Sequence, residues 1–310
     1  MVAGKPIMVT GKKHGLPYSK GLMASSIMAA GLSPGKAYRI AKQMEDHLRD
    51  QGIYSLTIGE LKELTMETLR TKVGEESADN YLQWQALGKL EKPLIIFIGG
   101  TTGVGKSTIA AELAHRLGIV RIVSTDAIRE VMRSLFSKEL MPTLYNSSFN
   151  AGEFLRLPLP KSADPVVLGF REQAQTVLVG IEAIIERAIN EGTNLVIEGA
   201  HVIPGFLYRK YSRKAFIIPL MIVVNDAEQH RGHFHIREVE SESYRPFKRY
   251  LANFDNIRKI QDYVKNLAKD HDVPIFSSYN LDTTISRIMS HIMNEIFSKK
   301  RALKPVKIKT

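Results

Sequence analysis

The strongest constraint on the fold of this 310-residue chain is the stretch 94–117, LIIFIGGTTGVGKSTIAAELAHRL. It consists of a short apolar run, a glycine-rich turn and an amphipathic segment with helical spacing. Residues 100–107, GTTGVGKS, match the pattern G-x-x-x-x-G-K-[ST] at every fixed position. Because the match follows a predicted strand and opens a predicted helix, it indicates a phosphate-binding loop rather than a chance glycine-rich turn.

Each fixed position of this motif has a physical role in binding a nucleoside triphosphate. The glycines allow a sharp turn that aims successive N–H groups at phosphate oxygens, and the helix adds the free N–H groups of its first turn. Lys106 is predicted to reach the β- and γ-phosphates of ATP and to act in catalysis, and Ser107 is predicted to bind Mg²⁺. The predicted ATP-binding residues are Gly100, Thr101, Thr102, Gly103, Val104, Gly105, Lys106, Ser107 and Thr108.

After residue 91 the predicted elements alternate between strand and helix, which indicates an α/β domain. Strands are predicted at 94–98, 119–123, 195–197, 216–224 and 274–276, and helices at 106–117, 127–135, 170–190, 227–239, 247–269 and 283–297. This alternation is typical of a doubly wound parallel sheet of the P-loop NTPase type, with helices on both faces. The segment 136–168 is predicted to be an irregular loop, and loops of this length are usually functional or disordered.

Amino-acid composition narrows the classes of protein to which the chain can belong. The chain is 44% hydrophobic and 24% charged, which is ordinary for a globular protein, and no apolar run is long enough to span a membrane. The N-terminus lacks the apolar core of a secretion signal and the chain has no cysteine, so we expect a cytoplasmic protein. The net charge is +11, and the tail 299–310 carries six basic residues and no acid. A solvated terminus is the favoured interpretation of this tail, and nucleic-acid binding is the alternative.

Residues 1–90 precede the phosphate-binding loop and are predicted to form a small, mostly helical domain. Apolar residues at helical spacing and a capping-box pattern at Thr57 and Glu60 support this prediction. The segment resembles the ATP-cone, a regulatory nucleotide-binding module. The residues that carry the resemblance are Lys12, Lys13, Gly15, Tyr18, Lys20, Tyr81 and Trp84. The resemblance implies a nucleotide effector, and the alternative is a packing module whose two adjacent lysines are merely solvated.

The turn Ser124-Thr125-Asp126 directly follows the second predicted strand of the α/β domain. In doubly wound sheets ligands bind at the edge formed by the carboxyl ends of the strands, and this turn lies at that edge. Asp126 is predicted to face the γ-phosphate and to orient or deprotonate an acceptor hydroxyl, a catalytic role, whereas capping of the next helix is the alternative. Arg129 and Arg133 share one helix face, and two guanidinium groups beside a carboxylate suit an anionic acceptor. Both arginines are therefore predicted to bind substrate.

The apolar strand at 195–197 ends in an acidic residue, Glu198. In P-loop enzymes a carboxylate at this place holds Mg²⁺ or its water ligands, so Glu198 is predicted to share the metal with Ser107. His201 follows close to the expected acceptor site and is a weaker candidate, because a lone histidine is usually structural.

The segment 230–237, HRGHFHIR, follows the fourth predicted strand of the α/β domain. Kinases of this architecture carry a lid there that excludes water from the transferring phosphoryl group. Arg231 is accordingly predicted to be catalytic, and Arg237 is predicted to bind the acceptor. Three histidines, at 230, 233 and 235, allow a zinc alternative, but the segment supplies no other metal ligand.

Taken together, the chain resembles the archaeal 2-phosphoglycerate kinases, which carry an ATP-cone-like domain before a P-loop domain. The stretches that carry the resemblance are 99–110, 124–133, 196–205, 233–238 and 250–263. It implies a regulatory domain at 1–90, a kinase domain at 91–298 and a basic tail at 299–310. It also implies ATP- and Mg²⁺-dependent phosphorylation of 2-phosphoglycerate to 2,3-bisphosphoglycerate, a step toward cyclic 2,3-diphosphoglycerate.

The residues themselves lead only to a phosphoryl-transfer enzyme with a small anionic acceptor. Two alternatives therefore stay open. One is a P-loop kinase that phosphorylates another hydroxy acid or a sugar acid. The other is an ATP-responsive regulator whose basic tail binds nucleic acid, although the charge of the rest of the chain makes nucleic acid a less favoured partner.

Overall fold

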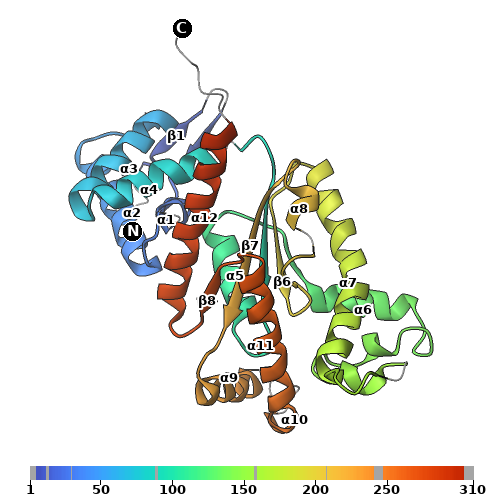
Figure 1. Cartoon of the computed structure of the whole chain (residues 1–310). Coiled ribbons are helices and arrows are strands. Elements are labelled where there is room, and N and C mark those ends of the chain that lie inside the picture. The colour runs from blue at the N-terminus through green and yellow to red at the C-terminus, as the bar shows by residue number, and fades with distance from the viewer. Residues whose placement is uncertain are drawn as a thin grey trace. The chain divides into compact units, whose positions relative to one another are not determined.

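The computed structural model describes residues 5–11, 14–28, 30–87, 90–156, 159–206, 208–240 and 247–303. The chain forms two compact units (Figure 1). The first unit contains the chain up to residue 90, residues 115–117 and the last helix from Met289 onward, and the second unit contains the rest. The predicted domain limits at 90 and 298 remain proposals. Of the predicted features, Lys12, Lys13 and tail residues 304–310 lie outside the described residues.

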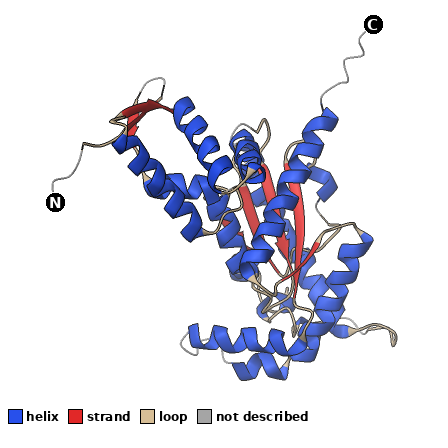
Figure 2. Cartoon of the chain, turned by 90° about the vertical axis from the view of Figure 1, so that its left-hand side faces the viewer, coloured by secondary structure: helices blue, strands red, loops and turns tan. Residues whose placement is uncertain are grey.

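The first unit is mostly helical, as predicted, and also contains a small sheet. Its elements are β1 (Met8–Thr10), β2 (Gly15–Pro17), α1 (Lys20–Met28), α2 (Pro34–Asp50), β3 (Ser55–Thr57), α3 (Ile58–Lys72) and α4 (Glu75–Leu87). The three strands pair in the order β2-β1-β3 and lie together at one end of these helices (Figure 2). The sequence does not reveal these strands because each has only three residues, too few for an alternating pattern.

Local signals explain the helices of this unit. The capping box at the start of α3 is confirmed: the Thr57 hydroxyl accepts from the Glu60 N–H, and the Glu60 carboxylate accepts from the Thr57 N–H. Helix α2 begins with Pro34 at its first position. The α2 residues that recur every three or four positions form its buried stripe: Ala37, Ile40, Ala41, Met44 and Leu48.

The second unit is built around a five-stranded sheet. Its strands are β4 (Leu94–Gly99), β5 (Ile122–Ser124), β6 (Leu195–Gly199), β7 (Phe216–Val223) and β8 (Ile275–Ser277). Its helices are most of α5 (Lys106–Arg116), α6 (Thr125–Leu135), η1 (Pro142–Tyr145), η2 (Ala151–Phe154), α7 (Pro165–Asn190), α8 (Tyr208–Tyr211), α9 (Ala227–Glu240), α10 (Phe247–Ala252), α11 (Phe254–Asp270) and the first part of α12 (Leu281–Leu303).

All strand pairs of this sheet are parallel, in the order β5-β6-β4-β7-β8. Alternate residues of β4, β6 and β7 pack against α6, α7 and α11, and Figure 1 shows α5 on the opposite side of the strands from α7. The predicted α/β class, a doubly wound P-loop sheet, is thereby confirmed. Within the described residues, no helix combines the length and the apolar character needed to cross a membrane.

Several predicted boundaries are wrong by a few residues. Strand β5 begins at Ile122 rather than at residue 119, and α7 begins at Pro165 rather than at residue 170. The early start of α7 has a clear cause, because the Asp164 carboxylate accepts from two N–H groups of the first turn and Pro165 occupies the first helical position. The single helix predicted over 247–269 is two helices, α10 and α11, with Asn253 between them.

Candidate active site

The predicted site residues gather where the parallel strands end. The phosphate-binding loop follows β4, and Asp126 follows β5 in the first turn of α6. Glu198 is the next-to-last residue of β6, and α9 follows β7. Strand β4 lies between β6 and β7, so the loop leaves the sheet where connections diverge to the two sides. In open parallel sheets this place forms the ligand-binding crevice.

The phosphate-binding loop occupies residues 100–105, and α5 begins at Lys106. Its three glycines, Gly100, Gly103 and Gly105, have φ angles of 141°, 87° and 82°. Side chains other than glycine rarely adopt these values, so the loop depends on glycine at these positions. The Lys106 ammonium donates to the Thr101 carbonyl oxygen at 2.6 Å. All nine residues predicted to bind ATP lie in this loop or in the first turn of α5.

The predicted metal ligands lie next to each other. The Ser107 hydroxyl donates to Glu198 Oε1 at 3.1 Å, and Glu198 is 6% exposed. Strand pairing explains this placement, since Glu198 pairs with Ile98 of β4 on one side and Ser124 of β5 on the other. A hydroxyl and a carboxylate are hard oxygen donors, and Mg²⁺ in nucleotide sites commonly takes one or two protein oxygens beside phosphate and water. The two side chains fit that ion.

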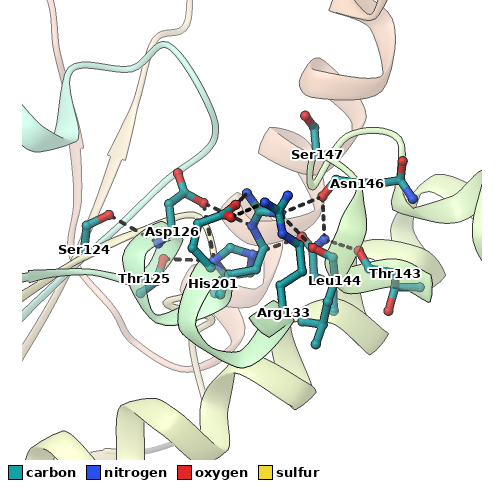
Figure 3. Close-up of polar contacts among 12 residues, drawn as sticks. Ser124, Thr125, Asp126, Arg133, Thr143, Leu144, Asn146, Ser147 and His201 are labelled. Atoms are coloured by element: carbon teal, nitrogen blue, oxygen red, sulfur yellow. Dashed lines mark hydrogen bonds and ion pairs between the residues drawn. The ribbon is translucent and has the colours of Figure 1, made fainter. Parts of the chain in front are cut away.

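Asp126 is an exposed carboxylate in the first turn of α6. The helix is capped by Ser124, whose hydroxyl accepts from the Asp126 N–H, so the Asp126 side chain is not the cap. That side chain is 70% exposed, and its Oδ1 lies 3.9 Å from both Arg129 Nε and His201 Nδ1. In Figure 3 Asp126, Thr125 and His201 form the left half of one polar cluster. An incoming ligand can therefore reach Asp126, and the Arg129 guanidinium and the His201 ring lie beside it.

His201 is buried and neutral, and its hydrogen bonds determine its tautomer. Its Nε2 contacts Gln173 Oε1 at 3.0 Å, and the Gln173 oxygen can only accept, so Nε2 carries the hydrogen. Its Nδ1 then accepts from the Thr125 hydroxyl at 2.9 Å. Burial is the main cause that lowers the pKa of His201 to about 4, and the nearby Asp126 carboxylate opposes this effect. His201 therefore connects β6 to α6 and α7.

Sequence reasoning missed Gln173, which anchors the segment between α6 and α7. The Gln173 amide donates to the carbonyl oxygens of Thr143 at 2.5 Å and Asn146 at 2.9 Å, and its side chain is fully buried. A signal was present in the sequence, because Gln173 interrupts the apolar stripe of α7. A polar residue on a buried stripe usually has a specific hydrogen-bonding partner. The cluster thus ties Asp126, through His201 and Gln173, to the loop that contains η1.

The two arginines of α6 have protein partners. Arg129 Nη1 donates to the carbonyl oxygens of Leu144 at 2.7 Å and Asn146 at 3.2 Å, and its Nη2 pairs with Glu130 at 2.8 Å. Arg133 pairs with the same Glu130 at 2.7 Å and lies over the Tyr145 ring. The sequence predicts that both guanidinium groups face the acceptor. In the structure Arg129 is mainly a tether for the η1 loop, and binding of the acceptor by either arginine remains a prediction.

The segment predicted to be a lid lies within a regular helix, α9. Arg231 pairs with Glu228, and its guanidinium lies 4.4 Å from the centre of the Phe254 ring. The side chain of Arg237 lies outside the described residues. In the part of the chain that the structure describes, no three histidine, aspartate or glutamate side chains are grouped as metal ligands, which gives the zinc alternative no support. His230 and His233 instead contact backbone carbonyls of the phosphate-binding loop.

Comparison with known proteins assigns the family. No protein-family model matches the chain. The chain is 42% identical over 292 residues to a 2-phosphoglycerate kinase of Methanothermobacter thermautotrophicus, covering 94% of each chain. It is 38% identical to one of Methanopyrus kandleri, covering 96% of this chain and 90% of the relative, and 40% identical to one of Thermococcus kodakarensis, covering 92% and 96%.

Among solved structures, a shikimate kinase of Acinetobacter baumannii in complex with shikimate is 16% identical over 71% of this chain, with a TM-score of 0.40. A gluconokinase of Sinorhizobium meliloti is 14% identical over 69% of this chain, with a TM-score of 0.39. The archaeal relatives are much closer and extend over almost the whole of both sequences. On this identity and coverage, the chain belongs to the 2-phosphoglycerate kinase family.

Proposed function

We propose that this chain transfers the γ-phosphoryl group of ATP to the free hydroxyl of 2-phosphoglycerate, producing 2,3-bisphosphoglycerate and ADP. The observation that carries the proposal is the 42% identity to a protein named 2-phosphoglycerate kinase over 94% of each chain. The site adds independent support, since a phosphate-binding loop, a buried carboxylate beside Ser107 and the exposed Asp126 carboxylate occur at one edge of a parallel sheet.

Lys106 and the loop are proposed to bind and polarise ATP. The loop N–H groups and the start of α5 favour phosphate oxygens. In the reaction the Lys106 ammonium exchanges the Thr101 carbonyl for the β- and γ-phosphates and stabilises the charge that builds up on them. Ser107 and Glu198 would hold Mg²⁺, which when bound neutralises charge on the phosphate oxygens.

Asp126 is proposed to act on the acceptor. Its carboxylate accepts the proton of the substrate hydroxyl as that oxygen forms a bond to the γ-phosphorus and the bond to the bridging oxygen of ADP breaks. The exposure of Asp126 supports this role, because the reacting hydroxyl has to reach the carboxylate. His201 Nδ1 accepts from Thr125, so we assign the proton to Asp126 and not to the buried imidazole.

Recognition of the acidic acceptor is proposed for Arg129, Arg133, Arg231 and Arg237. Arg133 and Arg231 have side chains that are 41% and 38% exposed and can be reached by a ligand. Arg129 is 15% exposed, and besides tethering the η1 loop it places positive charge next to Asp126. An acceptor with a phosphate and a carboxylate carries about three negative charges, and guanidinium groups pair well with both anions.

Residues 1–90 are proposed to be a regulatory unit that responds to a nucleotide. Two of the residues that carry the ATP-cone resemblance make contacts within this unit. The Tyr18 hydroxyl donates to the Ala41 carbonyl at 2.8 Å, and Lys20 pairs with Glu45 at 3.1 Å. A change in the ATP dependence of the rate on mutation of Lys12 and Lys13 would support an effector site. An unchanged ATP dependence would favour the packing-module alternative.

The proposed reaction is tested by product identification. Purified protein is incubated with ATP, Mg²⁺ and 2-phosphoglycerate, and the products are followed by phosphorus NMR, with 3-phosphoglycerate, gluconate and shikimate as alternative acceptors. We expect 2,3-bisphosphoglycerate and ADP in equal amounts, with 2-phosphoglycerate the best acceptor. Formation of no bisphosphoglycerate by a folded protein that binds ATP would contradict the assigned acceptor.

A further inference from the structure

Helix α9 contacts the phosphate-binding loop through two histidines. His230 Nε2 lies 2.8 Å from the Thr102 carbonyl oxygen, and His233 Nδ1 lies 2.9 Å from the Gly103 carbonyl oxygen. A carbonyl oxygen only accepts, so both ring nitrogens carry hydrogen and donate. These contacts join residues 128 and 130 positions apart in the sequence.

The direction of these hydrogen bonds determines where the neighbouring N–H groups point. In a planar trans peptide the C=O and the N–H of the same unit point in opposite directions. The Thr102 carbonyl belongs to the peptide that carries the Gly103 N–H, and the Gly103 carbonyl belongs to the peptide that carries the Val104 N–H. With both carbonyls held toward α9, the Gly103 and Val104 N–H groups point away from α9.

Packing around Gly103 supports the same arrangement. A Cβ atom at Gly103 would lie 2.4 Å from Phe234 Cε1, so the loop backbone rests directly on this ring. Phe234 is fully buried and stacks on His230 at 5.2 Å between ring centres and on Tyr250 of α10 at 4.8 Å. Burial lowers the pKa of His230 to about 4, so its ring is neutral and keeps one donor and one acceptor nitrogen.

We propose that His230 and His233 are positioning residues for the nucleotide: by holding the Thr102 and Gly103 carbonyls, they aim the Gly103 and Val104 N–H groups at the phosphates. The inference rests on the proposed use of ATP. It gives α9 a role distinct from that expected of its arginines. Through the two histidines, α9 positions the backbone of the phosphate-binding loop.

The experiment separates loss of the donor from loss of the ring. In His233→Asn the side-chain nitrogen is attached to Cγ, as Nδ1 is in histidine, so the donor is retained, whereas His233→Leu removes it. For His230 the matched pair is His230→Gln, which retains a donor at the position of Nε2, and His230→Leu. His235→Leu is the control on the same helix, since the His235 ring packs on Phe247.

ADP and ATP affinities are measured by calorimetry on the full chain, and kcat and both KM values are measured with 2-phosphoglycerate. We expect each leucine variant to bind ADP roughly tenfold more weakly, as for loss of a hydrogen bond to a buried carbonyl. The KM for ATP should rise while the KM for the acceptor changes little. The asparagine and glutamine variants should recover most of the affinity, and His235→Leu should match the wild type.

Three outcomes would overturn the inference: unchanged ADP affinity in folded His233→Leu, an equal loss in His233→Asn, or an equal loss in His235→Leu. His233 is half-buried, and His233→Ala provides a second test if the leucine variant does not fold. Failure of the wild type to bind either nucleotide would contradict the proposed function itself, which distinguishes the two failures.

Discussion

At the scale of single residues, the polar groups of the site differ in charge and in burial, and these differences suit them to different roles. Asp126 is exposed and Glu198 is buried, although both carboxylates lie at the carboxyl ends of strands of the same sheet. The exposed carboxylate is accessible to a substrate hydroxyl, whereas the buried carboxylate is held by Ser107. Two histidines, His201 and His230, are buried as neutral donors and acceptors that organise the backbone and side chains around them.

Replacement of Lys106 by alanine should abolish most of the activity without unfolding the chain. The ammonium stabilises charge that develops in the transition state, and losses of such groups commonly reduce kcat by on the order of 10²-fold or more. Steady-state kinetics on the purified variant, with circular dichroism to establish folding, would measure this loss. Near wild-type turnover would remove Lys106 from the proposed mechanism.

The Asp126→Asn and Arg129→Ala variants should affect different kinetic parameters. Asparagine keeps the shape of Asp126 but cannot accept the proton, so kcat should fall while the KM for 2-phosphoglycerate changes little. Arg129→Ala removes positive charge beside the acceptor and the tether to the η1 loop, so the KM for the acceptor should rise most. The same pattern in both variants would argue against separate roles.

The buried histidines predict a pH dependence of stability. His201 and His230 bind a proton below about pH 6.5 in the unfolded chain but only near pH 4 in the folded chain. The unfolded state therefore binds more protons between these values, and the free energy of unfolding falls as pH falls from 6.5 toward 4. The loss approaches about 1.4 kcal/mol per pH unit for each such histidine.

The test compares thermal unfolding of the wild type and His201→Gln at about pH 7 and about pH 5. Glutamine does not titrate in this range, so the Tm of the variant should decrease less than that of the wild type between the two conditions. Equal decreases in both proteins would mean that His201 does not contribute to the acid sensitivity.

At the scale of elements, the backbone of α7 packs closely against the backbone of the preceding segment. A Cβ atom at Gly169 of α7 would lie 2.2 Å from the Gly152 nitrogen of η2. This approach brings the η1 and η2 segment against α7, where Gln173 holds its carbonyls. The long connection between α6 and α7 is therefore anchored at defined points, and it lies beside the proposed acceptor site.

Two helical glycines provide a matched test of this packing. Gly169→Ala should lower the free energy of unfolding by about 1–3 kcal/mol, because the methyl group has no space. Gly232→Ala in α9 should raise it by about 0.5–1 kcal/mol, because a Cβ there meets no atom within 4 Å and alanine favours helix. Urea unfolding of both variants would measure the two changes. A stabilised Gly169→Ala would show that η2 and α7 are not closely packed.

At the scale of the whole molecule, every residue assigned to the proposed reaction lies in the second unit. Deletion of residues 1–90 should therefore leave acceptor-dependent ADP formation. Such a deletion also removes most of the first unit while the later part of α12 remains, with the buried residues Ile292, Met293 and Ile296. We accordingly expect a lower Tm and retained turnover at low temperature. A folded but inactive fragment would place part of the active site in residues 1–90.

The sequence alone determined the class of the second unit and the position of its phosphate-binding loop. The phosphate-binding loop, strand β4 and helix α5 are encoded by one contiguous stretch with a strong local pattern, so no tertiary information was needed to find them. The places of Asp126 and Glu198 at strand ends followed from the rule that parallel strands end at one edge.

Only the tertiary structure determined which side chains contact one another. The bonds from His201 to Gln173 and from His230 to Thr102 join residues 28 and 128 positions apart, and no local periodicity encodes such pairs. The contacts of Arg129 with the Leu144 carbonyl and of Arg231 with the Phe254 ring were hidden for the same reason, since a guanidinium group that suits a substrate also suits backbone carbonyls and aromatic rings of the protein. Side-chain chemistry can be read from the sequence, but the fold selects the partner.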